Sequence, residues 1–345
     1  MKYLYGVTFI VLLAIVAYFL KWPPWLVFAL SGLGIIPLAY LMGKATEELA
    51  ERVNPYIGGL LSAALGNAAE LIIGVFAIKE GLLDMVKASI TGSILGNLLV
   101  IMGLSFLLGG LSHGVLRFDR VGAGMRASML AIILIAVGIP SFFSYATKQS
   151  HSPPIDYLSY SVATIMVLLY ILLGLFFLSA PKGHKPPPLK EQSSATGPII
   201  MLASTVAGVA ILSELLVKST EPLIESLGIT EFFLGIFIIP LVGNVAEHFG
   251  AVVVAWKGKS ELSVTISLES SLQIALLIVP SFVFVSLGLG YHFTLVFTTL
   301  ELISLGAAVL IASLISLDGE ANWLEGVQLL AVYIILGLAF FFFPA

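Results

Sequence analysis

Long apolar runs separated by short polar segments dominate the chain. Eleven of these runs are long enough to cross a bilayer as helices, because about 20 apolar residues span its hydrocarbon core. They lie at residues 3–20, 24–43, 56–78, 84–108, 122–142, 156–180, 197–217, 232–256, 262–287, 292–316 and 323–343. The pattern therefore predicts an all-α polytopic membrane protein with eleven transmembrane helices.

The basic residues at the ends of these runs predict an orientation. Lys and Arg resist translocation and collect on the cytoplasmic side of a membrane protein. Most of the 16 Lys and Arg residues fall on the same side of the membrane as the N-terminus. The opposite side holds only Lys21, Lys79, Lys87, Lys148 and Lys218. We expect a multi-pass protein of the cell membrane with a cytoplasmic N-terminus and, because the number of spans is odd, a C-terminus outside.

The composition agrees with this class and excludes others. Hydrophobic residues make up 59% of the chain and charged residues 10%, with a mean hydropathy of +1.08, whereas a soluble domain has about a quarter charged residues. A net charge of −4 argues against nucleic-acid binding, and the lack of cysteine removes disulfides and thiolate metal sites. No paired-Asp, Ser/His or His-Glu-x-x-His set lies inside a span, so we do not expect an enzyme.

The two halves of the chain carry the same polar pattern. A shift of 177 positions aligns GNAAE at 66–70 with GNVAE at 243–247. Each half holds five spans, and an odd number inverts the second half relative to the first, as in secondary transporters. The predicted organisation is an extra N-terminal helix followed by two inverted five-helix repeats around a Pro-rich cytoplasmic linker, at 1–22, 23–180, 181–196 and 197–345.

Glu70 and Glu247 occupy equivalent positions in the middle of apolar spans. A charge at that depth costs at least about 2.5–3.5 kcal/mol, so each acid must be neutralised by a proton, a counter-charge or a bound cation. No basic residue is expected at the same depth, which leaves protons or a cation. Gly66 and Gly243 weaken the helix just before each acid, and backbone carbonyls freed there can bind a cation.

The polar residues around the two acids favour a cation held by oxygen atoms. The candidates are Asn67, Asn244, Ser93, Ser270, Asn97 and Gln273. Calcium takes about six to eight oxygen ligands with tolerant geometry, and two carboxylates balance its charge. A site that is neutral with either Ca²⁺ or protons, and costly when empty, predicts exchange of one for the other.

These motifs resemble the Ca²⁺/H⁺ exchangers of the calcium/cation antiporter superfamily over essentially the whole chain. The similar segments are GNAAELIIGVFAIKEG, KASITGSILGNLLVIMGLSFLLGG, GNVAEHFGAVVVAWKGK, SSLQIALLIVP and ATEELAER. The resemblance implies alternating access by sliding of the first two spans, with Glu70 and Glu247 as the ion-exchange acids. Ca²⁺ is then a substrate rather than a cofactor. Exchange of Na⁺, K⁺ or Mn²⁺ on the same scaffold is the alternative.

Some ionisable residues fall outside this pattern. Glu269 stands where the family usually has glycine, and the sequence leaves open whether it is an added ligand or a carboxylate outside the site. His248 is another candidate addition to the site, although we expect it to pack or form a hydrogen bond rather than relay protons. Glu214 and Glu301 either form a proton path or pair with polar neighbours. The expected partners are the two ions and the lipid bilayer, and association between copies of the chain is left open.

Overall fold

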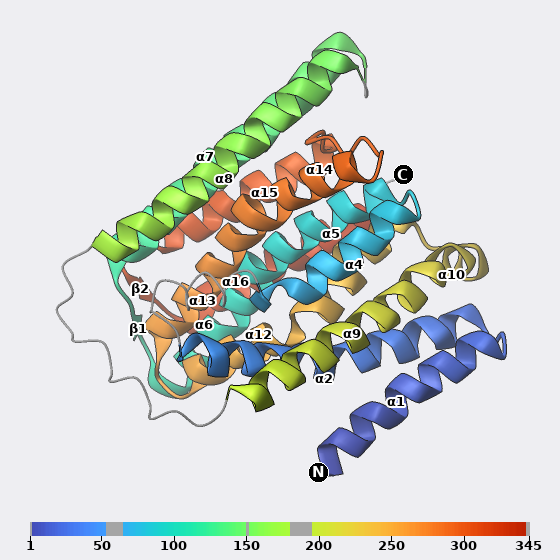
Figure 1. Ribbon diagram of the computed structural model, residues 1–345. Coiled ribbons are helices and arrows are strands. Elements are labelled where there is room, and N and C mark those ends of the chain that lie inside the picture. Colours follow the sequence, from blue (N-terminus) through green and yellow to red (C-terminus); the bar gives the residue numbers. More distant parts are fainter. Residues whose placement is uncertain (1, 53–64, 150–151, 180–194, 343–345) are drawn as a thin grey trace. The chain divides into compact units, whose positions relative to one another are not determined.

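The computed structural model describes residues 2–52, 65–149, 152–179 and 195–342 (Figure 1). These residues are almost wholly helical, as predicted. They form two compact units, of which unit 1 comprises Met1–Gly81, Leu168–Glu231 and Val242–Ala246, and unit 2 comprises Leu82–Val167, Phe232–Leu241 and Glu247–Ala345. Each unit therefore combines segments from both halves of the sequence.

Unit 1 is a bundle of helices packed around α2. Its helices are α1 (Lys2–Phe19), α2 (Pro24–Ala50), α4 (Ala68–Lys79), α9 (Thr196–Lys218) and α10 (Thr220–Leu227), with the end of α8 (Pro153–Ser179). Helix α2 packs along α9, and α1 and α4 contact both of them. A Cβ atom at Gly208 of α9 would lie 2.9 Å from Leu38 of α2. Small residues of this kind let membrane helices approach closely.

Unit 2 holds most of the remaining helices and one short β-ribbon. In chain order the elements are α5 (Leu83–Leu95), η1 (Gly96–Ile101), α6 (Met102–His113), β1 (Leu116–Arg117), α7 (Arg120–Thr147), the start of α8, most of α11 (Glu231–Phe233), η2 (Leu234–Ile238), α12 (Ile239–Trp256) apart from Val242–Ala246, α13 (Ser260–Gln273), η3 (Ile274–Ile278), α14 (Val279–Gly288), α15 (Thr299–Ile315), β2 (Glu320–Ala321) and α16 (Trp323–Phe342). Strands β1 and β2 pair in antiparallel fashion, with Leu116 opposite Ala321.

The two halves share local backbone features at positions related by the shift of 177. Gly81 and Gly258 both have a positive φ, of 80° and 78°, immediately before α5 and α13. Helix α5 continues into the π-helical segment η1, and α13 continues into η3, which lies within the residues that the shift assigns to η1. Short π-helical segments are rare and often mark functional places in a helix.

Seven helices of the described chain are long and apolar enough to cross a membrane. An eighth span results if Glu231–Val245 and His248–Trp256, whose axes meet at 67°, count as one bent crossing. The apolar helices Gly6–Phe19 and Thr299–Ile315 are shorter. Much of the predicted span 56–78 lies outside the described residues, so the count of eleven and the inverted topology stay predictions.

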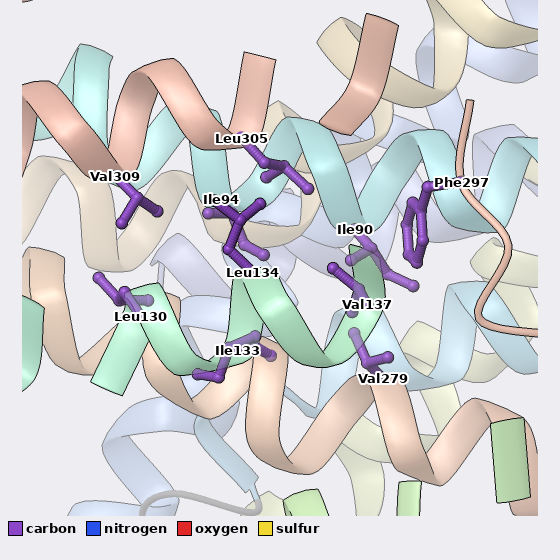
Figure 2. Close-up of a pocket in the computed structure, with 11 residues that line it drawn as sticks. Ile90, Ile94, Leu130, Ile133, Leu134, Val137, Val279, Phe297, Leu305 and Val309 are labelled. Atoms are coloured by element: carbon purple, nitrogen blue, oxygen red, sulfur yellow. The ribbon is translucent and has the colours of Figure 1, made fainter. Parts of the chain in front are cut away.

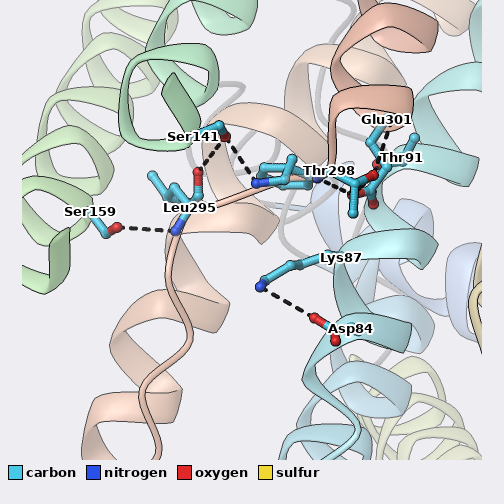
Figure 3. Close-up of polar contacts among 9 residues, drawn as sticks. Asp84, Lys87, Thr91, Ser141, Ser159, Leu295, Thr298 and Glu301 are labelled. Atoms are coloured by element: carbon cyan, nitrogen blue, oxygen red, sulfur yellow. Dashed lines mark hydrogen bonds and ion pairs between the residues drawn. The ribbon is translucent and has the colours of Figure 1, made fainter. Parts of the chain in front are cut away.

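The structure differs from the sequence-based prediction at the start of span 292–316. Residues 292–298 are not helical, and α15 begins only at Thr299. The capping box of Thr298 and Glu301 begins the helix there. The preceding backbone is satisfied by serine hydroxyls instead, since Leu295 N donates to Ser159 at 3.1 Å and Phe297 N donates to Ser141 at 2.9 Å (Figure 3). Such partners make irregular backbone tolerable at membrane depth.

A small cavity lies between α5, α7, α15 and η3 in unit 2 (Figure 2). Its lining is wholly apolar and includes Ile94, Leu134, Ala275 and Val309. Cavities without polar partners do not hold water. This part of unit 2 is therefore a dry packing region rather than an ion path.

Candidate ion-exchange site

Glu70 is a buried carboxylate at the beginning of a helix in unit 1. The chain leaves helical geometry at Asn67, and α4 begins directly after it, so that Glu70 lies in the first turn with 6% of its surface exposed. The positive end of a helix dipole favours a carboxylate at this place. The side-chain amide of Asn244 donates a hydrogen bond to Glu70 Oε1. The structure therefore brings together Glu70 and an amide from the second copy of the motif.

Gly243 has a packing role that sequence reasoning missed. A Cβ atom at this position would lie 2.7 Å from Cγ of Glu70. The glycine of the second motif therefore makes room for the acid of the first, although α12 continues through Gly243, from Ile239 to Trp256, rather than breaking there as expected. Gly66, its counterpart, directly precedes the break at Asn67, whose side chain is also buried.

A second polar cluster lies in unit 2 and centres on Asn97 in η1. The amide nitrogen of Asn97 donates to Ser270 Oγ at 2.9 Å, and its amide oxygen lies 3.0 Å from His248 Nε2. Asn97 and Ser270 are both buried. The contact between His248 and Asn97 links α12 to η1.

For the remaining candidates in the described part of the chain, the structure gives the helix and the burial. Ser93 is buried in α5, and the half-buried Gln273 is the last residue of α13, directly before η3. The side chain of Glu247 lies outside the described part of the structure. The meeting of Glu70 with Glu247 therefore stays a prediction. Within the described residues, no three or more side chains of His, Cys, Asp and Glu are grouped so as to hold a metal.

Glu269 forms an ion pair with Arg126 of α7 in unit 2. Its Oε1 lies 2.6 Å from Arg126 Nη2 and 3.1 Å from Nε. The Arg126 side chain is 12% exposed and that of Glu269 is 41% exposed. No signal in the sequence points to this partner, because Arg126 lies 143 positions away in the chain. An acid compensated in this way does not add charge to an ion site, which favours a role for Glu269 outside the ligand set.

The ion pair makes a stability prediction. We expect Arg126→Gln to destabilise the protein by about 1–2 kcal/mol, between the values for exposed and buried pairs, because it leaves Glu269 without its partner. The double variant R126Q/E269Q should recover most of this loss. Apparent melting temperatures in detergent measure both effects. A double variant less stable than R126Q alone would contradict the pairing.

Glu214 and Glu301 have polar partners. Glu214 lies 2.6 Å from Lys218 one turn along α9, and both side chains are more than one-third exposed. Of the two alternatives, a proton path or pairing with a polar neighbour, Glu214 therefore shows the second. Glu301 caps α15 and also accepts a hydrogen bond from Thr91 of α5. The capping sequence Thr-x-x-Glu was a signal that could have identified the helix start at 298–301.

Comparisons with known proteins extend over nearly the whole chain. The profile of the family described as sodium/calcium exchanger protein matches residues 23–179 and 197–342. The chain is 41% identical to the Ca²⁺/H⁺ antiporter of Synechocystis sp., over 96% of this chain and 95% of the relative. It is 40% identical to the Ca²⁺/H⁺ antiporter ChaA of Bacillus subtilis, over 95% of each. The solved structure of native YfkE is 39% identical and covers 98% of both chains, with a TM-score of 0.85.

Proposed function

Because this chain belongs to the sodium/calcium exchanger protein family, we propose that it is a secondary transporter that exchanges Ca²⁺ for H⁺ across the cell membrane. The observation that carries this proposal is the identity of about 40% to two Ca²⁺/H⁺ antiporters over at least 95% of each sequence. The family profile also covers both halves of the chain, at residues 23–179 and 197–342. The nearly all-helical structure and its long apolar helices agree with a membrane transporter.

Glu70 and Glu247 are the acids to which we assign the exchanged ions. The burial of Glu70, its place at a helix start and its hydrogen bond from Asn244 support this assignment. Glu247 takes the equivalent place in the second motif. The remaining oxygen ligands are assigned to Asn67, Asn244, Ser93, Ser270, Asn97 and Gln273.

Charge couples the two ion fluxes in this proposal. Two ionised carboxylates in a dry interior are costly, whereas the site is neutral with one Ca²⁺ or with two protons. Only the two neutral forms then cross between the two access states. Ca²⁺ and protons therefore replace one another at the acids, and neither crosses without the other in a full cycle.

Uptake into liposomes tests this function. The full chain is reconstituted into vesicles with an acidic interior, and Ca²⁺ is added outside. A difference of two pH units stores about 2.7 kcal/mol for each proton that leaves, so we expect Ca²⁺ to accumulate above its external concentration. Dissipating the gradient with a protonophore together with a potassium ionophore should stop accumulation.

The same vesicles separate the alternatives. Replacing Ca²⁺ by Na⁺, K⁺ or Mn²⁺ shows which cation collapses the pH gradient. Ca²⁺ uptake that ignores the pH gradient, or a gradient that only a monovalent cation collapses, would overturn the assignment.

We further propose that the N-terminus is cytoplasmic. In this orientation, Lys79 and Lys87 lie on the outer side of the membrane.

A further inference from the structure

We propose that Glu301 is an additional proton-binding carboxylate, whose charge is controlled by a lysine that it shares with Asp84. The group lies at the start of α15 in unit 2, where Thr91 of α5 donates to it, and Lys87 lies one turn earlier on α5 (Figure 3). Its use of the proton in transport rests on the proposed function. Its ability to bind a proton does not, and that ability is argued from the contacts below.

The carboxyl group of Glu301 is fully buried and bound only by uncharged donors. Its exposed fraction is 0%. Oε2 accepts hydrogen bonds from the backbone N–H of Thr298 at 2.8 Å and from its hydroxyl at 2.9 Å, and Oε1 accepts from the hydroxyl of Thr91 at 3.1 Å. Burial of an ionised carboxylate is very costly and favours the protonated form, whereas the three donated hydrogen bonds stabilise the ionised form. Glu301 therefore has surroundings that support either protonation state.

Helix capping explains only part of this arrangement. A glutamate at the third position of a helix commonly binds the backbone N–H of the capping residue, and Oε2 does so here. The other oxygen is bound by Thr91, which is 210 residues away in sequence and belongs to the helix that carries Ser93. The carboxyl group thus connects α15 to the helix of a predicted ion-site residue.

Lys87 supplies a charge that two acids compete for. It lies one turn before Thr91 on α5, and its side chain is 12% exposed. Its ammonium group lies 3.4 Å from Asp84, whose side chain is 78% exposed, and 6.0 Å from the centre of the Phe293 ring. Residues four apart share a face of a helix, so Lys87 lies on the same face of α5 as Thr91, which binds Glu301. Lys87 therefore pairs with an exposed acid and lies one helical turn from the residue that binds a buried one.

The other elements packed against α15 are α7, α16 and η1. Among the described residues, no charged side chain of these elements forms an ion pair with Glu301. On the segment before α15, His292 lies 3.5 Å from Asp156 of α8, which gives that imidazole its own partner. The charge balance around Glu301 therefore depends on Lys87 and Asp84.

Proton binding then moves Lys87 between partners. When Glu301 takes a proton from water on the Asp84 side, its carboxylate becomes a neutral carboxyl group and Lys87 pairs with Asp84, as in the structure. When the proton leaves, Lys87 compensates the buried negative charge instead. The shift of 177 places Val264 and Leu268 at the positions of Lys87 and Thr91, so this device has no copy in the second half.

Infrared titration of the purified full chain tests the proposal. The carboxyl C=O band of the wild type minus that of Glu301→Gln isolates this group, and we expect E301Q to lose one titrating band. Removing the cation in Lys87→Met should move the midpoint to higher pH by about one unit, because the ionised form loses its partner. Removing the competing acid in Asp84→Asn should move the midpoint to lower pH by a similar amount.

The two opposite shifts distinguish proton binding from a structural role. Glu214→Gln, which removes an exposed and paired carboxylate, is the matched control and should leave the Glu301 midpoint unchanged. If E301Q does not fold, the wild type, K87M and D84N still give the shifts. An unchanged carboxyl band in E301Q, or shifts of the same sign in K87M and D84N, would overturn the proposal. Failure of wild-type liposomes to exchange Ca²⁺ for H⁺ would overturn the proposed function but not the infrared result.

Discussion

Replacing Glu70 by glutamine should abolish Ca²⁺ uptake driven by a pH gradient. The variant keeps the size and the hydrogen-bonding capacity of the side chain but removes the charge that balances the cation. A charge near the membrane centre is worth about 2.5–3.5 kcal/mol, so the loss in initial rate should be on the order of 100-fold or more. Uptake of ⁴⁵Ca into liposomes with an acidic interior measures it, and Glu247→Gln should give the same result.

A control for this prediction lies on the same helix. Glu80 is exposed at the end of α4, so Glu80→Gln removes a carboxylate without touching the buried acid. It should transport at the wild-type rate. Normal uptake by both E70Q and E247Q would exclude the two acids as the exchange site, even if the protein proved to be a Ca²⁺/H⁺ antiporter.

The substitution Gly92→Ala should severely destabilise the protein. A Cβ atom at Gly92 of α5 would overlap the backbone carbonyl oxygen of Ile236 in η2. A backbone carbonyl cannot rotate away as a flexible side chain does, so α5 and η2 must separate. We expect a loss of about 3 kcal/mol or more, the upper end for overpacking a core. The fraction of monodisperse protein after heating in detergent measures this loss.

Another helical glycine provides the comparison. Gly138 in α7 has no neighbouring atom within 4 Å of its added Cβ, so Gly138→Ala should be neutral or stabilising by up to about 1 kcal/mol. If G92A and G138A melt at the same temperature, the close approach of α5 to η2 is not a feature of the folded protein.

The helices could be predicted from the length of the apolar runs, because a membrane requires long apolar helices whatever their partners. The start of α15 was missed although Thr298 and Glu301 form a capping sequence, because the apolar run begins earlier, at residues 292–298. Their backbone becomes tolerable only through Ser141 and Ser159, which lie far away in sequence.

The hydrogen-bond and ion-pair partners of the site residues could not be predicted from the sequence either. The repeat identifies Asn97 and Ser270, but not that they bind each other or that His248 joins them. Likewise, nothing in the pattern assigns Arg126 to Glu269. Membrane helices are apolar on most faces, so periodicity does not reveal which face meets which neighbour. Which side chains meet depends on how each helix is rotated about its own axis, and only a structure gives that rotation.

The π-helical segments η1 and η3 have a consequence for how each half can rearrange. A π turn holds one surplus residue relative to an α turn, and neighbouring residues of an α-helix differ by about 100° in direction. Moving the surplus by one position would re-aim a single side chain by roughly that angle while the rest of the helix kept its register. Asn97 lies inside one such turn and Gln273 directly precedes the other. In the described residues, each half thus carries an amide in or directly beside a π turn, where it can change direction without the helix being rebuilt.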